Sequence, residues 1–259
     1  MGAVVTFSYQ SHSPIAEHEA SESSFSDRVA QLLDRTDYRL ATTAAERDAI
    51  FRLRYDAYRR EETISPHASR KFTDPHDLSE NAFLFGVYID DQLASSMRIH
   101  VGSKEHQDLP SLEVFPDVLQ GELDAGKIIV DSTRFVTEEH LSRLHRGLPY
   151  VTLRLCWMAV EHFRADHFLA AIRTEHQGFY RRTFQHHVIC EPRPYPLLSK
   201  PISLMTVHYP TVADRVHRRY PFFRSTLFER RMLFDRHGAM SNSLQPDAGS
   251  LAAADPALC

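Results

Sequence analysis

The chain has 259 residues, with 30 Lys and Arg, 34 Asp and Glu, and a formal net charge of -4. Hydrophobic residues make up 42% and charged residues 25%, which is ordinary for a globular protein. The length allows one large domain or two small ones. The longest apolar stretch, residues 155–160, is too short for a membrane span, and the acidic balance argues against nucleic acid as a partner.

The two ends of the chain differ from its middle. Residues 11–27 are rich in Ser and Glu, and residues 239–259 are small and polar. Neither stretch can bury enough apolar surface to offset chain entropy. We therefore expect a disordered extension over 1–36, in which a short helix could form, one folded domain over 37–237 and a disordered tail over 238–259.

Strand-like and helix-like segments alternate within the expected domain. A strand at 38–42 precedes Thr43 and Glu46, a capping box that opens a helix running to about residue 62. Apolar strands at 82–89 and 93–101 flank a hairpin turn at Asp90-Asp91. The later expected elements are a short helix at 112–123, a strand at 128–136, a helix at 150–164, a strand at 168–172, a helix containing 178–184, strands at 188–190 and 202–208, and a helix capped by 211–214. This order predicts an α/β or α+β domain around one mostly antiparallel sheet.

Charged residues interrupt the first expected helix and the loop that follows it. Arg54 shares a helical stripe with Phe51 and Tyr58, so its guanidinium must meet an anion or reach outward to water. Asp74 and Asp77 could hold Arg54, or the ammonium group of a substrate, by charge-assisted hydrogen bonds. The alternative for the two carboxylates is an Asp-Pro turn exposed to water.

Two expected strands also carry charges. In the strand at 93–101, alternation places Arg98 on the face opposite Met97 and Ile99, where a surface position is the simpler interpretation. Asp131 and Arg134 lie three apart within 128–136, so they point to opposite faces unless a bulge intervenes. Such a bulge would turn both groups toward one site, whereas the alternative is an ion pair at the edge of the core.

Taken in order, these residues resemble the acyl-homoserine-lactone synthases, which have the fold of GNAT acyltransferases. The stretches IFRLRYDAY at 50–58 and DSTRF at 131–135 more closely resemble the N-acyl amino acid synthases of the FeeM type. The resemblance covers about 38–210 and implies a GNAT-like fold with a central, mixed and mostly antiparallel sheet flanked by helices. It also implies an N-acyltransferase that passes a fatty acyl group from acyl carrier protein, as a phosphopantetheine thioester, to the amino group of an amino acid.

The resemblance also assigns site residues. The positions that match the family's polar site are Arg54, Asp74, Asp77, Arg98, Asp131 and Arg134, and Tyr58 and Phe135 join them as substrate-binding residues. Lactone synthases carry a Trp ten residues after the helix Arg, beside their S-adenosylmethionine site, and Ile64 stands there in this chain. This departure favours an amino acid acceptor. A lactone synthase using S-adenosylmethionine and a non-catalytic acyl-carrier or lipid-binding module remain as alternatives.

The chemistry of amide formation suggests roles for these side chains. The acceptor amine must lose a proton, and a carboxylate such as Asp131 can take it, directly or through water. A backbone N–H at a strand bulge can stabilise the oxyanion, and the thiolate needs little protonation on leaving. Glu175 is a second candidate base. Tyr180, in a run that resembles a late GNAT helix, is a candidate acid, with core packing as its alternative role.

Further residues of this chain are candidates for binding the carrier of the acyl group. The stretch 144–149 keeps Gly147 but lacks the other residues of the [RQ]xxGx[GA] pattern of acetyl-CoA users, which favours a single pantetheine phosphate held by Arg143 or Arg146. Residues 211–237 contain seven Arg and three acidic residues, a balance of +4, so we expect Arg215, Arg218 and Arg219 to dock the acidic carrier protein. The Phe residues between them could pack on the core or on a partner.

Metal and disulfide chemistry are not expected. His140 and His145 are five apart, as are His162 and His167, whereas a helix face needs a spacing of four, and no HExxH occurs. We therefore expect no metal and no bound cofactor. The three cysteines form no CxxC pair, and residues 1–16 lack the basic start of a secretory signal, so a reduced, cytoplasmic protein is expected.

Overall fold

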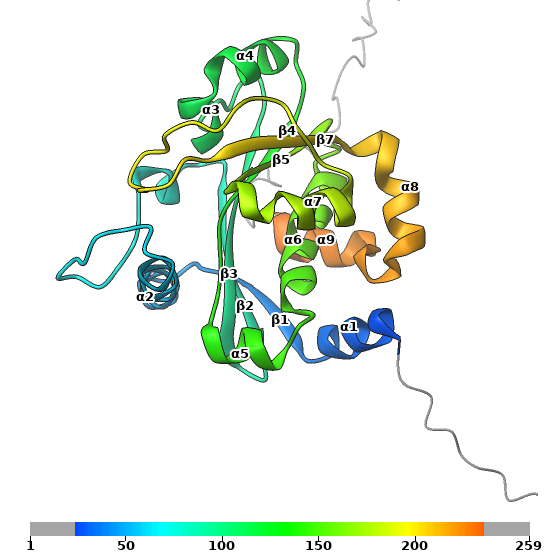
Figure 1. Cartoon of the computed structure of the whole chain (residues 1–259). Coiled ribbons are helices and arrows are strands. Elements are labelled where there is room, and N and C mark those ends of the chain that lie inside the picture. The colour runs from blue at the N-terminus through cyan, green and yellow to red at the C-terminus, as the bar shows by residue number, and fades with distance from the viewer. Residues whose placement is uncertain (1–23, 236–259) are drawn as a thin grey trace, which may run out of the picture.

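A seven-stranded sheet forms the centre of the molecule (Figure 1). The computed structural model describes residues 24–235. The strands are β1 (Thr36–Leu40), β2 (Ala82–Ile89), β3 (Gln92–Gly102), β4 (Ile129–Thr137), β5 (His167–Ile172), β6 (His187–Val188) and β7 (Ser203–His208). They lie in the order β1-β2-β3-β4-β5-β7-β6, and among them only β4 and β5 pair in parallel. The expected mixed, mostly antiparallel sheet is confirmed.

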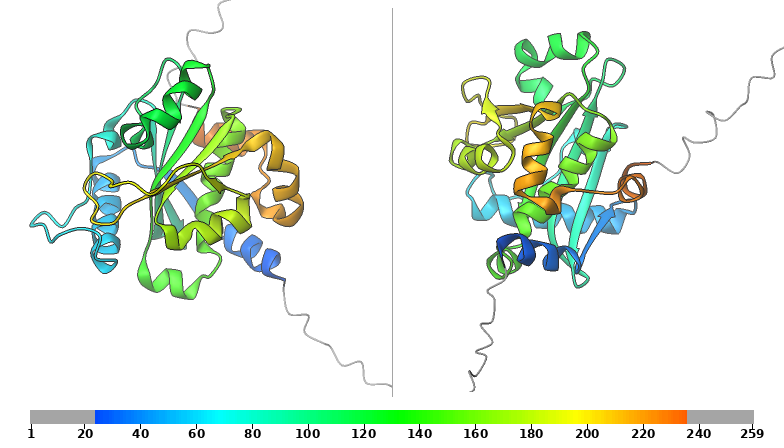
Figure 2. Two further views of the ribbon diagram at one scale, coloured as in Figure 1. Left: turned by 45° about the horizontal axis from the view of Figure 1, so that its top comes forward. Right: turned by 90° about the vertical axis from the view of Figure 1, so that its right-hand side faces the viewer.

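Helices cover both faces of this sheet. The α-helices are α1 (Phe25–Leu33), α2 (Ala44–Arg60), α3 (Pro110–Val114), α4 (Pro116–Asp124), α5 (Glu139–Leu144), α6 (Leu148–His162), α7 (Gln177–Phe184), α8 (Tyr209–Arg219) and α9 (Leu227–Phe234), and the 3-10 turns are η1 (Pro75–Leu78), η2 (Thr174–His176) and η3 (Pro221–Phe223). Helix α2 lies on one face, and α6 with α9 lies on the other (Figures 1 and 2). The main core fills the space between the sheet and α6, where Trp157 is fully buried. Within residues 24–235 no helix has both the length and the apolar character that crossing a membrane requires.

Two local signals in the sequence have the expected structure. Thr43 Oγ accepts from the Glu46 backbone N–H, and Glu46 Oε2 accepts from the Thr43 N–H, so the capping box opens α2. Asp90 and Asp91 join β2 to β3 and both have positive φ, 47° and 63°. Two such residues form the tight turn whose twist matches a hairpin, and Asp tolerates this backbone region better than most side chains.

The folded region begins earlier than residue 37. Ser24 and Asp27 form a second capping box that opens α1, and Val29 and Leu32 are buried against the rest of the core. This is the short helix that could form within 1–36, and few apolar side chains anchor it. The residues expected to be disordered at 1–23 and 238–259 lie outside the described part of the chain.

The C-terminal elements also correct the expectations. Helix α8 begins at Tyr209 with Pro210 in its first turn, so Thr211 lies inside the helix and does not cap it. Helices α5 and α9 were not expected. Of the interleaved aromatic residues, Phe222, Phe223 and Phe234 are buried in the core and Phe228 is exposed. A buried side chain holds this segment in place, since Arg154 of α6 donates to Phe222 O at 2.8 Å.

The parallel strands β4 and β5 separate partway along their length. They pair from Ile129 opposite His167 to Ser132 opposite Ala170. Strand β4 then continues to Thr137, whereas β5 ends at Ile172. Beyond Ser132 the β5 side of β4 therefore lacks a paired strand within the described sheet, and backbone groups there can meet a ligand.

Candidate active site between two diverging strands

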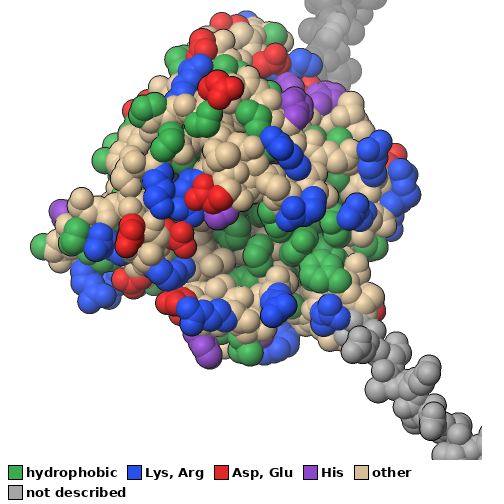
Figure 3. Space-filling model, in the orientation of Figure 1, with side chains coloured by type: hydrophobic (Ala, Val, Ile, Leu, Met, Phe, Trp, Pro, Cys, Tyr) green, Lys and Arg blue, Asp and Glu red, His purple; other side chains and the backbone are tan. Residues whose placement is uncertain are grey.

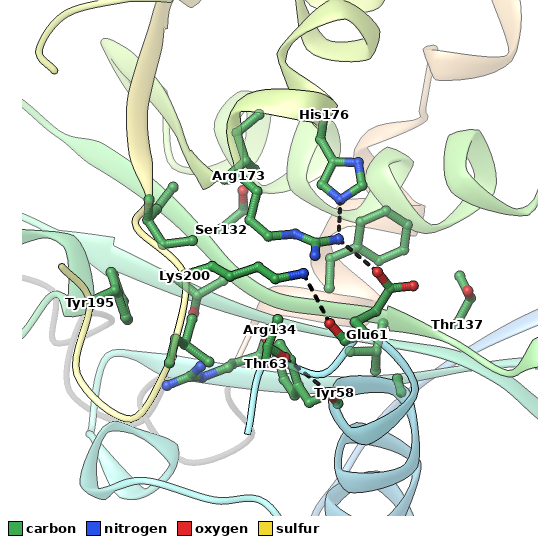
Figure 4. Close-up of a pocket in the computed structure, with 18 of the residues that line it drawn as sticks. Tyr58, Glu61, Thr63, Ser132, Arg134, Thr137, Arg173, His176, Tyr195 and Lys200 are labelled. Carbon is green, nitrogen blue, oxygen red and sulfur yellow. Dashed lines mark hydrogen bonds and ion pairs between the residues drawn. The ribbon is translucent and has the colours of Figure 1, made fainter. Parts of the chain in front are cut away.

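A cavity of about 430 Å³ opens where β4 and β5 diverge (Figures 3 and 4). Its walls come from β4, the end of β5, the C-terminal end of α2, the start of α7 and the segment before β7; the lining residues fall within 57–63, 132–137, 149, 171–180 and 195–202. Phe135, Ile172 and Phe179 make part of the surface apolar. A concave, largely apolar cavity with a few converging polar groups is the usual form of a small-molecule site.

A bulge in β4 shapes one wall of this cavity. Ser96 of β3 pairs with Val136 and Arg98 pairs with Thr133, so two residues of β4 lie opposite the single residue Met97. Arg134 occupies this extra position with a φ of 57°. The bulge turns the Arg134 side chain onto the sheet face that carries Arg98, as the spacing of Asp131 and Arg134 had suggested.

Five side chains singled out in the sequence form one ion-pair network under the cavity. Arg54 Nη1 lies 2.7 Å from Asp77 Oδ1, and Arg98 Nη1 lies 3.0 Å from the same oxygen. Arg98 Nη2 donates to Asp74 Oδ2 at 3.3 Å, and Arg134 Nη2 donates to that oxygen at 2.6 Å. Every one of these side chains is at most 5% exposed. The interpretations of a water-exposed Asp-Pro turn, an outward-reaching Arg54 and a surface Arg98 are therefore wrong.

The three arginines keep both carboxyl groups of the network ionised. Burial by itself raises the pKa of Asp74, but the hydrogen bonds and charges of Arg98 and Arg134 outweigh it, so the pKa lies below its usual range. Burial acts on Asp77 in the same way, and the charges of Arg54 and Arg98 again lower its pKa. The two carboxylates hold arginines in place, so neither is free to act as a base toward a substrate.

This network makes stability depend on pH at the acid end. The pKa values of Asp74 and Asp77 are lower in the folded than in the unfolded protein, so the unfolded chain binds more protons in acid. Their contribution is complete above the ordinary carboxyl pKa of about 4 and is lost as pH falls below it. We expect urea titrations to give a free energy of unfolding that declines between about pH 4 and about pH 2. The Asp74→Asn variant should be less stable at neutral pH with a shallower decline, and an unchanged decline would contradict this assignment.

Arg134 is the member of the ion-pair network that lines the cavity. Its Nε and Nη2 donate to Asp74 Oδ2 at 3.0 and 2.6 Å. Its guanidinium carbon lies 4.8 Å from the ring centroid of Phe72 and 5.8 Å from those of Tyr58 and Tyr195. Aromatic faces attract a guanidinium, so these contacts fix the direction of the group. The result is an immobile positive charge beside Tyr58, which also lines the cavity.

A second polar cluster lies across the cavity and was not expected from the sequence. Arg173 Nη2 donates to Glu61 Oε2 at 2.9 Å and to His176 Nε2 at 2.8 Å, and Lys200 Nζ donates to the backbone oxygen of Glu61 at 3.2 Å (Figure 4). Because arginine can only donate, His176 Nε2 accepts and the imidazole is neutral in this arrangement. Burial, followed by the charge of Arg173, lowers the pKa of His176 accordingly. Glu61 and Arg173 are 112 positions apart, so no local pattern links them.

The three expected acid–base residues have different locations. Asp131 is fully buried, and its Oδ2 and Oδ1 accept from the backbone N–H and hydroxyl of Ser111 at 2.9 and 2.8 Å. It holds the start of α3 and does not line the cavity, so its assignment as the base is corrected. Glu175 is also outside the cavity, with a side chain 56% exposed and an ion pair to Arg173 at 3.2 Å. Tyr180 lines the cavity, and burial raises its pKa, which keeps the hydroxyl protonated at neutral pH.

The expected carrier-binding residues lie outside the cavity. Arg143 is exposed and pairs with Glu139 one helical turn earlier, and Arg146 is exposed beside it. Gly147 precedes α6 and is covered by α1, because a Cβ atom there would lie 3.2 Å from Val29 Cγ2. The α8 arginines that were expected to dock the carrier, Arg215, Arg218 and Arg219, are exposed, and basic side chains gather over that helix in Figure 3. Within the described residues, no group of three or more His, Cys, Asp or Glu could hold a metal ion.

Known proteins share both the sequence pattern and the fold. The family described as N-acyl amino acid synthase FeeM matches residues 49–208. The structure of FeeM, an N-acyl amino acid synthase from uncultured soil microbes, is similar with a TM-score of 0.58 and 16% identity, over 73% of this chain and 98% of that one. TofI, in a ternary complex with an inhibitor and MTA, is similar with a TM-score of 0.51 and 14% identity, over 69% of this chain and 95% of that one. No curated protein sequence matches.

The two structural likenesses show the GNAT-like acyltransferase fold. The family match is the stronger finding, because it spans more than half of the chain and includes α2, the bulged strand β4 and the whole ion-pair network. This chain is therefore an acyltransferase and belongs to the FeeM family of N-acyl amino acid synthases.

Proposed function

We propose that this enzyme transfers a fatty acyl group from acyl carrier protein to the amino group of a free amino acid. The observation that carries the proposal is the cavity between β4 and β5, which has the fixed cation Arg134 on one wall and the Glu61–Arg173 pair on another. Membership of the family gives the class of reaction. The acyl donor, the acceptor and the roles of individual side chains are inferred from the chemistry of the cavity.

The open side of β4 suits the thioester end of the donor. Past Ser132 this side of the strand has no pairing partner in the described sheet, and the bulge at Arg134 changes the direction of the backbone there. A backbone N–H in such a place can donate to the carbonyl oxygen and stabilise it as it becomes an oxyanion. Phe135 and Ile172 supply apolar surface for the pantetheine arm and the first part of the acyl chain.

The charged residues of the cavity suit an amino acid acceptor. The carboxylate of Glu61 can bind the ammonium group of the acceptor and then take its proton, directly or through water. Lys200 and Arg134 can bind the acceptor's carboxylate by charge-assisted hydrogen bonds. The free amine attacks the thioester carbon, the C–S bond breaks, and the nitrogen loses its second proton to water as the amide forms. The protonated hydroxyl of Tyr180 lies on the wall from which the departing thiolate can receive a proton.

The exposed arginines of α8 favour a carrier protein as the molecule that carries the acyl thioester. Arg215 and Arg218 are exposed and add positive charge to the surface of α8, and acyl carrier proteins are acidic. Complementary charge accelerates association and makes it sensitive to salt. A cytoplasmic location, where such carriers occur and cysteines stay reduced, remains a prediction.

A mass-spectrometric assay tests this proposal. The purified chain is mixed with one fatty acyl group on either acyl carrier protein or coenzyme A, together with each of the twenty amino acids in turn. We expect the mass of an N-acyl amino acid to appear, with a higher kcat/KM for the carrier-bound donor that falls as salt rises. If both thioesters stay intact with every amino acid and with S-adenosylmethionine, the proposed function is refuted. Release of methylthioadenosine would instead identify a lactone synthase.

A further inference from the structure

A second, shallower depression lies beside the cavity. It is lined by residues from the start of α1, the start of α6 and the end of α8, namely Ser24, Phe25, Ser26, Tyr150, Arg219 and Tyr220. Five of these six residues lie outside the 49–208 stretch that the family shares. The depression is therefore built largely by segments that flank the matched region.

Aromatic contacts connect the depression to the cavity. Pro149 and Phe179 line the cavity, and the centroid of the Phe179 ring lies 5.1 Å from the centroid of the Tyr150 ring in the depression. The centroid of the Tyr150 ring lies 4.9 Å from that of the Phe25 ring. In Figure 3 an apolar surface runs from the central hollow toward the right of the molecule, with basic side chains above and below it. A long, flexible ligand could thus reach from the depression into the cavity.

The depression has the polar groups needed to bind an anion. Arg219 is exposed, its guanidinium carbon lies 5.4 Å from the ring centroid of Tyr220, and no carboxylate among residues 24–235 forms an ion pair with it. Burial raises the pKa of Tyr150, so its hydroxyl stays protonated. A hydrogen bond with Thr183 and the charges of Arg182 and Arg219 oppose this rise, which places both arginines near the hydroxyl. None of the described lining residues is acidic, and the neighbouring Asp27 accepts from the Ser24 backbone N–H at 3.0 Å.

The start of α6 offers an anion few free backbone N–H groups. A helix N-terminus usually binds phosphate through free backbone N–H groups. Here the Leu148 N–H donates to His145 O at 2.9 Å, Pro149 has no N–H, and the Tyr150 N–H donates to Gly147 O at 3.0 Å. Helix α1 also covers Gly147. An anionic ligand entering here must therefore be held by side chains.

We propose that Arg219, Tyr150 and Tyr220 bind the phosphate of a 4′-phosphopantetheine arm whose thioester end lies in the cavity. A single linear arm carries a phosphate at one end and the thioester at the other, which matches a basic, hydroxyl-lined depression joined to the cavity by an apolar path. The inference rests on the proposed thioester donor. It moves the phosphate from Arg143 and Arg146, where the sequence had suggested it, to the junction of α1, α6 and α8.

Two small donors test this site without a carrier protein. The same acyl group is attached to 4′-phosphopantetheine and to pantetheine, which differ only in the phosphate. We expect the wild type to have a kcat/KM about tenfold higher with the phosphorylated donor, mainly through a lower KM. Arg219→Ala should bring this ratio close to one. Tyr150→Phe, which removes only a hydroxyl, should lower the ratio less.

Arg52→Ala is the charge-matched control, because this α2 side chain is 65% exposed and lies in neither the cavity nor the depression. It should keep the wild-type ratio. A wild-type ratio of one, or an Arg219→Ala variant that slows both donors equally, would overturn the site. In a further arm, Arg219→Ala is assayed with acyl carrier protein and with acyl-coenzyme A. The phosphopantetheine source whose kcat/KM falls about tenfold is the one that uses the depression.

Binding measurements separate the site from the proposed function. If the wild type turns over no thioester, the proposed transfer fails, but the site is still tested with unacylated 4′-phosphopantetheine and pantetheine. We expect only the phosphorylated compound to raise the melting temperature of the wild type, since a ligand that binds the folded state stabilises it. The Arg219→Ala variant should lose this increase. Equal shifts with both compounds, or none with either, would refute the phosphate site.

Discussion

Replacing Arg134 by alanine is expected to lower kcat/KM by about a hundredfold, which corresponds to about 2.7 kcal/mol of transition-state stabilisation. Arg134 is the member of the buried network that lines the cavity, and two of its nitrogen atoms are bound to Asp74. Its side chain is 5% exposed, so the contact of the guanidinium with Asp74 does not compete with a solvent-exposed rotamer. A charge fixed in this way stabilises an anionic group without further reorganisation. Steady-state kinetics with the acyl-carrier donor measure the effect.

Arg134→Lys is the matched variant for this experiment. Lysine keeps the positive charge but lacks the planar fork that binds Asp74 through two nitrogens, so we expect an intermediate loss. Thermal melts of both variants separate catalysis from folding, because removing one partner of a buried ion pair can cost about 3–5 kcal/mol of stability. An Arg134→Ala protein that melts cooperatively and keeps wild-type turnover would leave Arg134 with a purely structural role.

Glu61→Gln is expected to lower kcat by about a hundredfold, within the range that general base catalysis usually supplies. The substitution keeps the shape of the side chain but removes the carboxylate that we propose binds the acceptor. Glu61 is bound to Arg173 at the edge of the cavity, and its side chain is 49% exposed, so the fold should tolerate the change. Steady-state kinetics measure the loss, and a matched Glu175 variant distinguishes a base from a residue that only positions Arg173.

Glu175→Gln is the control, because Glu175 is also ion-paired to Arg173 but lies outside the cavity. Its turnover should stay close to that of the wild type. If instead Glu175→Gln loses the rate and Glu61→Gln keeps it, the base lies on the outer side of Arg173. Equal losses in both variants would indicate that each carboxylate merely holds the arginine.

The sequence contained enough information to predict the sheet, most of its helices and the family. Capping boxes, hairpin turns and apolar periodicity act over a few residues, so the helix start at Thr43 and the turn at Asp90-Asp91 can be read directly. Arg54 and Arg98 were also informative, because a charge within an apolar segment needs a partner wherever the chain folds. Both guanidinium groups contact the buried Asp77, and within the described residues Arg54 Nε and Nη2 have no hydrogen-bond partner.

Only the tertiary structure decided which acidic group lies at the cavity. Asp131 shares a sheet face with Arg98 and, through the bulge, with Arg134, but α3 packs over it there and Ser111 takes both of its oxygens. Glu61 ends one helix and Arg173 follows a distant strand, and neither position has a local pattern that marks it. Local signals in a sequence determine where helices and strands begin and end, whereas the groups that a side chain meets depend on how distant elements pack.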